Sequence, residues 1–137
     1  MVLIEGVSAR QLLELPDAEL DGLLLTKDPI VFAVGSARIL GRARLEPPRL
    51  VVELGHIDGG GEGVLRVLWC LARAYARRRG VEQVEWLVHA VTCARPNLKL
   101  RRVLEKRGFT VQEVTGIGAV YRFMDEAGSP GSRVRSA

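Results

Sequence analysis

The sequence predicts an α+β fold in which a mixed central sheet is flanked by helices. Residues 30–57 contain three apolar runs separated by turn-forming residues, which is typical of consecutive antiparallel strands. A glycine cluster at residues 59–63 follows the third run and opens a long apolar helix. Beyond this helix, strand-like and helix-like segments alternate, and such crossovers place strands parallel to one another. Antiparallel and parallel pairs are therefore expected within one sheet.

The length and composition fit one domain with a single hydrophobic core. The chain has 137 residues, of which 47% are hydrophobic, so a core of ordinary size can form. We expect this domain to span residues 1–124 and to be followed by a disordered tail at 125–137, which is rich in Gly, Ser and Arg. No apolar run reaches the ~18–20 residues of a membrane span, and the amino terminus lacks a basic leader region. The expected location is the cytoplasm, without a membrane partner.

The amino-terminal part of the chain predicts a strand and two helical segments. Val2–Ile4 is a short apolar run that suits a first edge strand. Ser8 can cap a helix that continues through Leu15, because its hydroxyl accepts a hydrogen bond from an otherwise unpaired backbone N–H. Pro16 restarts the helical pattern, which leucines at helical spacing continue until the Asp28–Pro29 pair stops it.

Three strands are predicted next, at residues 30–34, 37–45 and 49–57. Gly35–Ser36 supplies the turn between the first two strands. The Pro47–Pro48 pair separates the second strand from the third, because neither proline can donate a ladder hydrogen bond. The three strands together predict an antiparallel meander.

The longest helix is predicted at residues 64–79. Apolar side chains cover most of its circumference, which suits a helix packed hard against a sheet. Cys70 lies within this helix and is expected to be a small core residue. Gly80 follows three arginines and ends the helix, since glycine adopts the conformation that a helix terminus requires.

The remainder of the domain predicts strand, helix, strand and strand, at residues 84–91, 97–107, 109–114 and 119–124. Gly108 and the glycines near residue 117 mark the turns between them. We expect the last strand, 119–124, to lie at an edge of the sheet. An unpaired edge can add a strand from a second copy, so a homodimer is an expected assembly.

Two separated motifs occur in a recognisable order. The segment from Asp58 to Gly63 reads Asp-Gly-Gly-Gly-Glu-Gly, and the later helix begins at Asn97 and stops at Gly108-Phe109. From about Ile30 to Phe123 the chain resembles the GNAT superfamily of N-acetyltransferases, in which strand, glycine turn, long helix, strand, helix, Gly-Phe and strand follow in this order. The resemblance implies a GNAT-like fold with acetyl-coenzyme A, or another acyl-coenzyme A, as co-substrate and with no metal.

The resemblance also implies a cofactor site. A turn without side chains lets backbone N–H groups approach a phosphate, and the following helix terminus adds a partial positive charge. In the family this turn holds the pyrophosphate of the cofactor, and the later asparagine bonds to the pantetheine arm. The turn is also consistent with a tight connection that binds no ligand, and the asparagine with a helix cap. The corresponding residues here are Gly59, Gly60, Gly61, Glu62, Gly63, Val64 and Asn97.

Acyl transfer to an amine requires a base, and Glu53 is the first candidate. It is a carboxylate inside an apolar strand, where the resemblance places the base of many family members; its alternative role is a salt-bridged strand residue. His56 follows on the same strand and is expected on the opposite face. His89, near the end of strand 84–91, is a second candidate or a satisfied strand histidine. A nucleophilic pair of His89 with Cys93, and a metal site that adds His56, lack diagnostic spacing.

The departing thiolate requires an acid. Many family members place a tyrosine where this chain has Leu104, and leucine cannot donate a proton. Tyr121, on the last predicted strand, is the candidate replacement. Its alternative role is that of a half-buried strand aromatic.

The sequence leaves two functions open. One is transfer of an acyl group, expected to be acetyl, to an amine acceptor that is a small molecule, a protein or a peptide. The other is a catalytically inactive GNAT-like scaffold that binds a protein partner or regulates it, a reading favoured by Asp58, Glu62 and Leu104, which depart from the family motifs. The net charge of +4 favours anionic ligands. Nucleic acid is disfavoured, because the basic stretch 95–107 contains no aromatic residue for base stacking.

Overall fold

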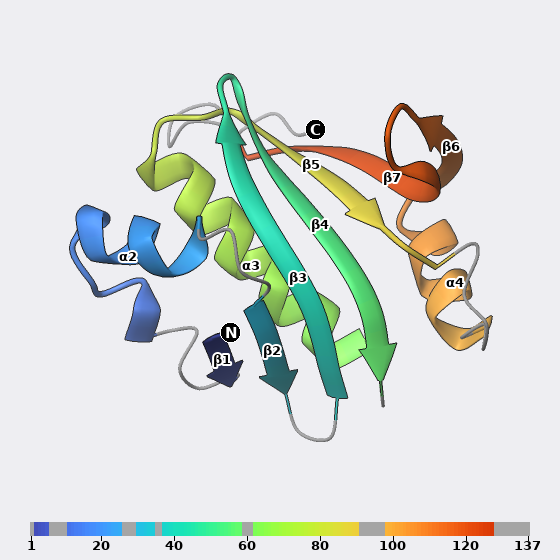
Figure 1. Ribbon diagram of the computed structural model, residues 1–137, viewed down its shortest axis with the longest axis horizontal. Helices are drawn as coiled ribbons and strands as arrows, with labels where there is room; N and C mark the ends of the chain where they lie inside the picture. Colours follow the sequence, from blue (N-terminus) through green and yellow to red (C-terminus); the bar gives the residue numbers. More distant parts are fainter. Residues whose placement is uncertain are drawn as a thin grey trace.

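The fold is built on one mixed seven-stranded sheet with strand order β1-β2-β3-β4-β5-β7-β6 (Figure 1). The structure, a computed structural model, describes residues 2–5, 11–25, 30–34, 37–58, 62–90 and 98–127. The β1–β2 and β4–β5 pairs are parallel and the others antiparallel, which confirms the expected α+β class and mixed sheet. The strands are β1 (Val2–Glu5), β2 (Ile30–Val34), β3 (Ala37–Glu46), β4 (Arg49–Asp58), β5 (Gln83–Val88), β6 (Thr110–Val114) and β7 (Gly118–Glu126).

The described helices are α2 (Asp17–Leu24), α3 (Glu62–Arg78) and α4 (Leu98–Lys106), and they share one hydrophobic core with the sheet. In Figure 1, α3 crosses behind β3 and β4, and α2 lies beside α3. The apolar stripe of each helix is buried in this core, as the helical spacing of its leucines requires. Members of the core from all three helices and from the sheet include Leu20, Leu68, Leu104, Val52, Leu54 and Trp86.

The two faces of the sheet differ, because side chains alternate along each strand. On β4, Leu50, Val52 and Leu54 are buried with the helices. Glu53 and Val51 point to the opposite face, where Val51 packs with Leu87 and Val120 in a small second cluster. No side chain of a described helix belongs to this second cluster. The face that carries Glu53 is therefore the barer one.

The meander of β2, β3 and β4 follows the predicted pattern. β2 pairs with β3 and β3 with β4, both antiparallel, and the peptide bond between Pro47 and Pro48 in the second turn is cis. Near the end of β4 the register shifts, so that His56 and Ile57 stand opposite Ile39 alone. This two-against-one pairing is a β-bulge, which bends the longer strand and leaves one residue out of the ladder.

Both α3 and α4 end in the same glycine motif. The N–H groups of Gly80 and Val81 donate back to the last turn of α3, and Gly80 has φ +74°. Gly108 has φ +102°, and the Phe109 N–H donates to the Leu104 carbonyl at 3.0 Å. These 6→1 and 5→2 bonds form the Schellman motif, which the Arg-Gly and Gly-Phe sequences predict. The glycines turn the chain from each helix towards its next strand.

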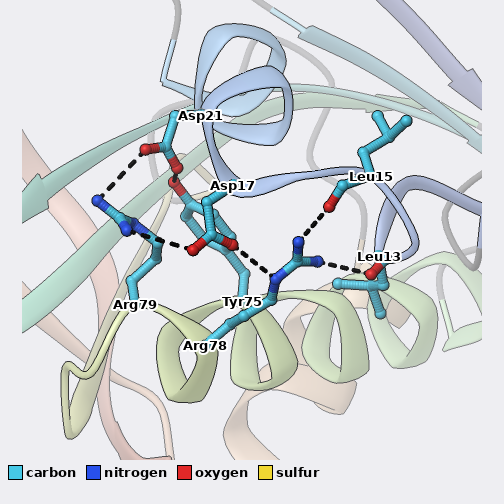
Figure 2. Close-up of polar contacts among 7 residues, drawn as sticks. All are labelled: Leu13, Leu15, Asp17, Asp21, Tyr75, Arg78 and Arg79. Atoms are coloured by element: carbon cyan, nitrogen blue, oxygen red, sulfur yellow. Dashed lines mark hydrogen bonds and ion pairs between the residues drawn. The ribbon is translucent and has the colours of Figure 1, made fainter.

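A polar cluster, formed by Leu13, Leu15, Asp17, Asp21, Tyr75, Arg78 and Arg79, attaches the amino-terminal segment to the carboxyl-terminal turns of α3 (Figure 2). Arg78 is its centre. Its guanidinium donates to the Asp17 carboxylate at 2.8 Å, to the Leu13 carbonyl at 2.6 Å and to the Leu15 carbonyl. Arg78 thus satisfies backbone carbonyls that precede α2, where no helix partner is available.

The second half of the cluster is the Tyr75 side chain. Its hydroxyl donates to Asp21 of α2, and Arg79 lies 3.3 Å from the other oxygen of the same carboxylate. Burial is the main cause that raises the pKa of Tyr75, and the hydrogen bond to Asp21 raises it further. The phenol therefore stays protonated and keeps its donor role.

Three predicted features of the carboxyl-terminal half are wrong. Residues 119–124 are not at an edge, because β7 lies between β5 and β6; β6 is the edge strand at this end of the sheet. The ordered chain does not stop at residue 124, since β7 continues through Glu126 and Ala127 is buried. Cys70 is exposed on α3 and is not a core residue. Periodicity misplaced Cys70 because the apolar surface of α3 does not extend around the whole helix.

Two further elements end at least three residues earlier than expected. α2 ends at Leu24, earlier than the Asp28–Pro29 stop, and β5 ends at Val88 where a strand to residue 91 was predicted. The predicted start of the first helix at Ser8 lies outside the described residues, as does the chain from residue 128 onwards. None of the described helices is both long and apolar enough to cross a membrane.

Candidate functional site

The candidate site lies where the parallel strands β4 and β5 part. Their ladder runs from Arg49 and Gln83 to Leu54 and Val88, and the His89 N–H still donates to the Leu54 carbonyl at 2.8 Å. β5 ends there, whereas β4 continues to Asp58 alongside β3. Figure 1 shows the two strands diverging towards their carboxyl ends. In a sheet with parallel strands, a gap at the carboxyl ends is where ligands commonly bind.

Glu53 and His89 meet at this fork. The His89 Nε2 atom lies 2.7 Å from the Glu53 Oε2 atom, a strong hydrogen bond between two potentially charged groups. The side chains are 23% exposed for Glu53 and 36% exposed for His89, so a substrate can reach them from solvent. The second oxygen of Glu53 lies 3.9 Å from the Arg44 guanidinium. The pair combines an accessible proton acceptor with a residue that orients it, which is the arrangement of a general base.

The register of the sheet explains the pairing. Glu53 stands opposite Leu87 in the parallel ladder, and His89 is two residues beyond Leu87. Residues two apart on a strand share a face, so His89 projects on the same face as Glu53. Each residue was a separate candidate in the sequence. The sequence did not predict their contact, because the contact depends on the β4–β5 register. Local sequence indicates only which residues of one strand share a face, through their alternation along the strand.

A hollow of about 300 Å³ opens beside the pair, lined by Leu40, Gly41, Arg42, Glu53, Gly55 and His89. Gly55 contributes to its shape, since a Cβ at this position would lie 3.9 Å from the His89 ring. The missing side chain keeps the space next to the imidazole open. The hollow is large enough for a small organic group, and its only described carboxylate is Glu53.

Tyr121 lies elsewhere. It pairs with Val88, one residue before His89, and is buried on the helix side of the sheet. Its hydroxyl donates to Glu105 of α4 at 2.9 Å. Burial and, secondarily, the bond to Glu105 raise the pKa of Tyr121, which keeps the phenol protonated. The structure thus brings Glu53 and His89 together and separates Tyr121 from both by the thickness of the sheet.

Leu104, the position at which the resemblance would place a tyrosine, is fully buried in the core. Glu105, the next residue of α4, is the partner of the Tyr121 hydroxyl. A protonated phenol therefore does lie beside this turn of α4, although it comes from β7. The structure places Arg101 of α4 within 2.8 Å of the Ala90 carbonyl, which ties the helix to the chain just beyond β5.

Several predicted site residues lie outside the described part of the chain. These are Gly59, Gly60, Gly61 and Asn97, together with Cys93 and the side chains of His56, Glu62 and Val64. The backbone of α3 begins at Glu62 and includes Gly63, so the glycine segment does connect the end of β4 to a helix amino terminus. In the described residues, no group of three His, Cys, Asp or Glu side chains is placed to hold a metal ion.

The chain was compared with protein-family models and with curated proteins. No protein-family model matches the chain, and no curated protein matches it either.

Proposed function

We propose that this protein is a GNAT-type acyltransferase that moves an acyl group, expected to be acetyl, from acyl-coenzyme A to an amine. The observation that carries the proposal is the Glu53–His89 hydrogen bond at the fork between β4 and β5. A base beside an opening in the sheet, next to a glycine segment that leads into a helix, is the combination that this chemistry requires.

The topology supports a place for the cofactor. β4 continues for four residues beyond its last pair with β5, and the segment that follows opens α3 at Glu62. The amino terminus of a 17-residue helix carries a partial positive charge and unpaired N–H groups, which suit a pyrophosphate. In the proposed complex, the extended arm of the cofactor would enter where β4 and β5 part. Acyl-coenzyme A would therefore present its thioester at the fork where Glu53 and His89 lie.

The reaction follows from these positions. The acceptor amine approaches from the hollow and loses a proton to the Glu53–His89 pair as its nitrogen attacks the thioester carbon. The C–N bond forms, the C–S bond breaks, and the thiolate of coenzyme A leaves and takes up a proton. The β-bulge at His56 and Ile57 lies close to the fork. A backbone N–H left out of the ladder there would be suited to bind the developing oxyanion. The amide product and the free thiol then leave.

The thiolate is formed on the cofactor side of the fork. Tyr121 pairs with Val88 next to the fork, on the helix-covered side of the sheet, and its raised pKa keeps it a proton donor. Its bond to Glu105 holds the hydroxyl at α4. Tyr121 is accordingly proposed as the acid, acting directly or through a water molecule.

The test is a double-mutant cycle on the pair. The wild-type chain is first offered a panel of amines with acetyl-coenzyme A, and free thiol is measured. Glu53→Gln and His89→Asn should each lower turnover by about 10²–10⁴-fold, the usual contribution of a general base. The double variant should lose little more than either single variant, because the two residues act as one unit. Glu46→Gln, which removes an exposed carboxylate from β3, should retain activity.

Two results would contradict the proposal. The first is unchanged turnover in a folded Glu53→Gln variant, which would make the pair a structural ion pair. The second is calorimetric titration of the wild-type chain with acetyl-coenzyme A that shows no binding. Tight cofactor binding without acylation of any amine would favour the non-catalytic scaffold, for which the buried Leu104 is the supporting observation.

A further inference from the structure

Arg42 is the cation of the hollow. It lies on β3 directly opposite Glu53, on the same face of the sheet, and it lines the hollow together with Glu53 and His89. The Arg42 side chain forms no hydrogen bond or ion pair with any residue that the structure describes. The guanidinium is therefore available to a ligand.

The neighbouring charges do not neutralise Arg42. Glu53, its cross-strand neighbour, is bonded to His89, and the cation nearest to this carboxylate is Arg44 at 3.9 Å. Arg44 itself is bonded to Glu46 further along β3. Glu53 is thus already paired, and its cross-strand arginine remains as an unpaired positive charge in a site that also holds a base.

The cross-strand spacing of Arg42 and Glu53 bears on the size of a ligand that could contact both side chains. Opposite residues of an antiparallel pair have Cβ atoms about 5 Å apart. A molecule whose amine reaches Glu53 or His89 can therefore place an anion a few bonds away at Arg42. Arginine binds carboxylate and phosphate oxygens through paired N–H donors, and it repels a second ammonium group.

We propose that the acceptor is a small amine that carries a carboxylate or a phosphate a few bonds from its nitrogen, and that Arg42 binds this anion. The inference rests on the proposed function for the reaction itself, and it adds the acceptor class and the residue that selects it. Arg42 positions the acceptor so that its nitrogen lies between the Glu53–His89 pair and the thioester. Diamines and lysine-rich peptides should be poor acceptors.

The test compares matched acceptors in wild-type protein and in Arg42→Gln. β-Alanine is paired with β-alaninamide, 2-aminoethyl phosphate with ethanolamine, and 1,3-diaminopropane is the cationic probe. Arg38→Gln, an exposed arginine on the same strand that does not line the hollow, is the matched control. Thiol release gives kcat and KM for each acceptor. For each acceptor, kcat and KM of the variant are divided by the wild-type values, so that differences in amine basicity cancel.

A charge-assisted contact of this kind should favour the acidic acceptor of one pair by about 10- to 100-fold in KM. Arg42→Gln should abolish this preference, because the variant lacks the cation that contacts the anion, and Arg38→Gln should keep it. The pair that shows the preference identifies the anion as carboxylate or phosphate. Equal use of acidic and neutral acceptors by wild type and Arg42→Gln would overturn the acceptor class and leave the acyltransferase proposal standing.

A binding measurement separates the two hypotheses when no acceptor is acylated. Both acidic probes are titrated into the wild-type chain and into Arg42→Gln, and binding is followed by NMR. Saturable binding that Arg42→Gln removes, together with no turnover, would refute the proposed reaction and support Arg42 as an anion-binding residue. No saturable binding and no preference would overturn the inference itself.

Discussion

Both tyrosines of the chain, Tyr75 and Tyr121, are buried donors to carboxylates on neighbouring helices. Burial is the largest cause that raises the pKa of each phenol, and the partners Asp21 and Glu105 add to it. A raised pKa means that the folded chain keeps a proton that the unfolded chain releases at about pH 10. Below that pH both states are protonated and the contribution to stability is complete.

The expected outcome is a loss of stability above about pH 10. Each tyrosine should then lower the free energy of unfolding by up to ~1.4 kcal/mol per pH unit, because only the unfolded state ionises. Urea unfolding at pH 8 and at pH 11 measures the loss. Tyr75→Phe should cost about 1 kcal/mol at pH 8, through its bond to Asp21, and should reduce the alkaline loss. Tyrosinate absorbance that rises with a midpoint near pH 10 in the folded chain would contradict the prediction.

Elements are delimited in this protein by glycines in the left-handed region. Gly80 ends α3 with φ +74° and Gly108 ends α4 with φ +102°, conformations that other residues adopt at a cost. The surroundings of the two positions differ. A Cβ at Gly80 would meet nothing within 4 Å, whereas a Cβ at Gly108 would lie 3.2 Å from the Phe123 ring. Substitutions at Gly80 and Gly108 therefore distinguish the cost of backbone strain alone from the cost of strain plus steric contact.

Gly108→Ala should destabilise the protein more than Gly80→Ala. The Gly80 variant bears the backbone strain alone, about 1 kcal/mol. The Gly108 variant adds a contact with Phe123, whose ring is stacked on Phe109 at a centroid distance of 5.3 Å and cannot move freely. We expect an additional ~1–2 kcal/mol from this overpacking. Denaturant unfolding of the two variants measures the difference. Equal losses in the free energy of unfolding would show that the Phe123 ring moves to accommodate the added Cβ.

The same elements show how far sequence reasoning reaches. The order of strands and helices was predictable because prolines and glycines mark their ends locally, as at Pro47–Pro48, Gly80 and Gly108. The neighbours of β7 were not, since the sequence between residues 118 and 126 suits an edge or an inner strand equally well. The Glu53–His89 contact was likewise not predictable from local sequence. Both residues were candidates, but their meeting depends on long-range pairing of β4 with β5.

At the scale of the whole molecule, the main core and the candidate site lie on opposite faces of the sheet. The helix-covered face contains the main core, with Trp86 stacked on Trp69 at a centroid distance of 4.8 Å. The opposite face carries Arg42, Glu53 and His89 over a much smaller cluster. Substitutions in the hollow should therefore alter activity with little change in the free energy of unfolding. A homodimer stays a prediction, and β6 replaces residues 119–124 as the edge to which it would apply.

The carboxyl-terminal end of β7 fastens the helix layer to the sheet. The Arg73 guanidinium donates to the Glu126 carbonyl at 3.1 Å and lies 3.3 Å from Asp125. Arg77 donates to the Ala127 carbonyl at 2.9 Å, and the Ala127 N–H donates to the carbonyl of Glu82, just before β5. These residues join α3, β5 and β7 at one corner. A domain boundary at residue 124, which composition suggests, cuts through this corner.

Truncation of the chain at two points tests that boundary. A chain of residues 1–127 keeps every contact of the corner, whereas residues 1–124 lose two ladder positions of β7 and the bonds to Arg73 and Arg77. With several hydrogen bonds worth ~1 kcal/mol each and a buried alanine removed, the shorter chain should be less stable by at least about 2 kcal/mol. Arg77→Gln in the 1–127 chain should reproduce part of the loss, and in the 1–124 chain it should have little further effect. Thermal and urea unfolding of the four proteins measure this coupling. Equal stability of the two truncated chains would place the end of the domain at residue 124 after all.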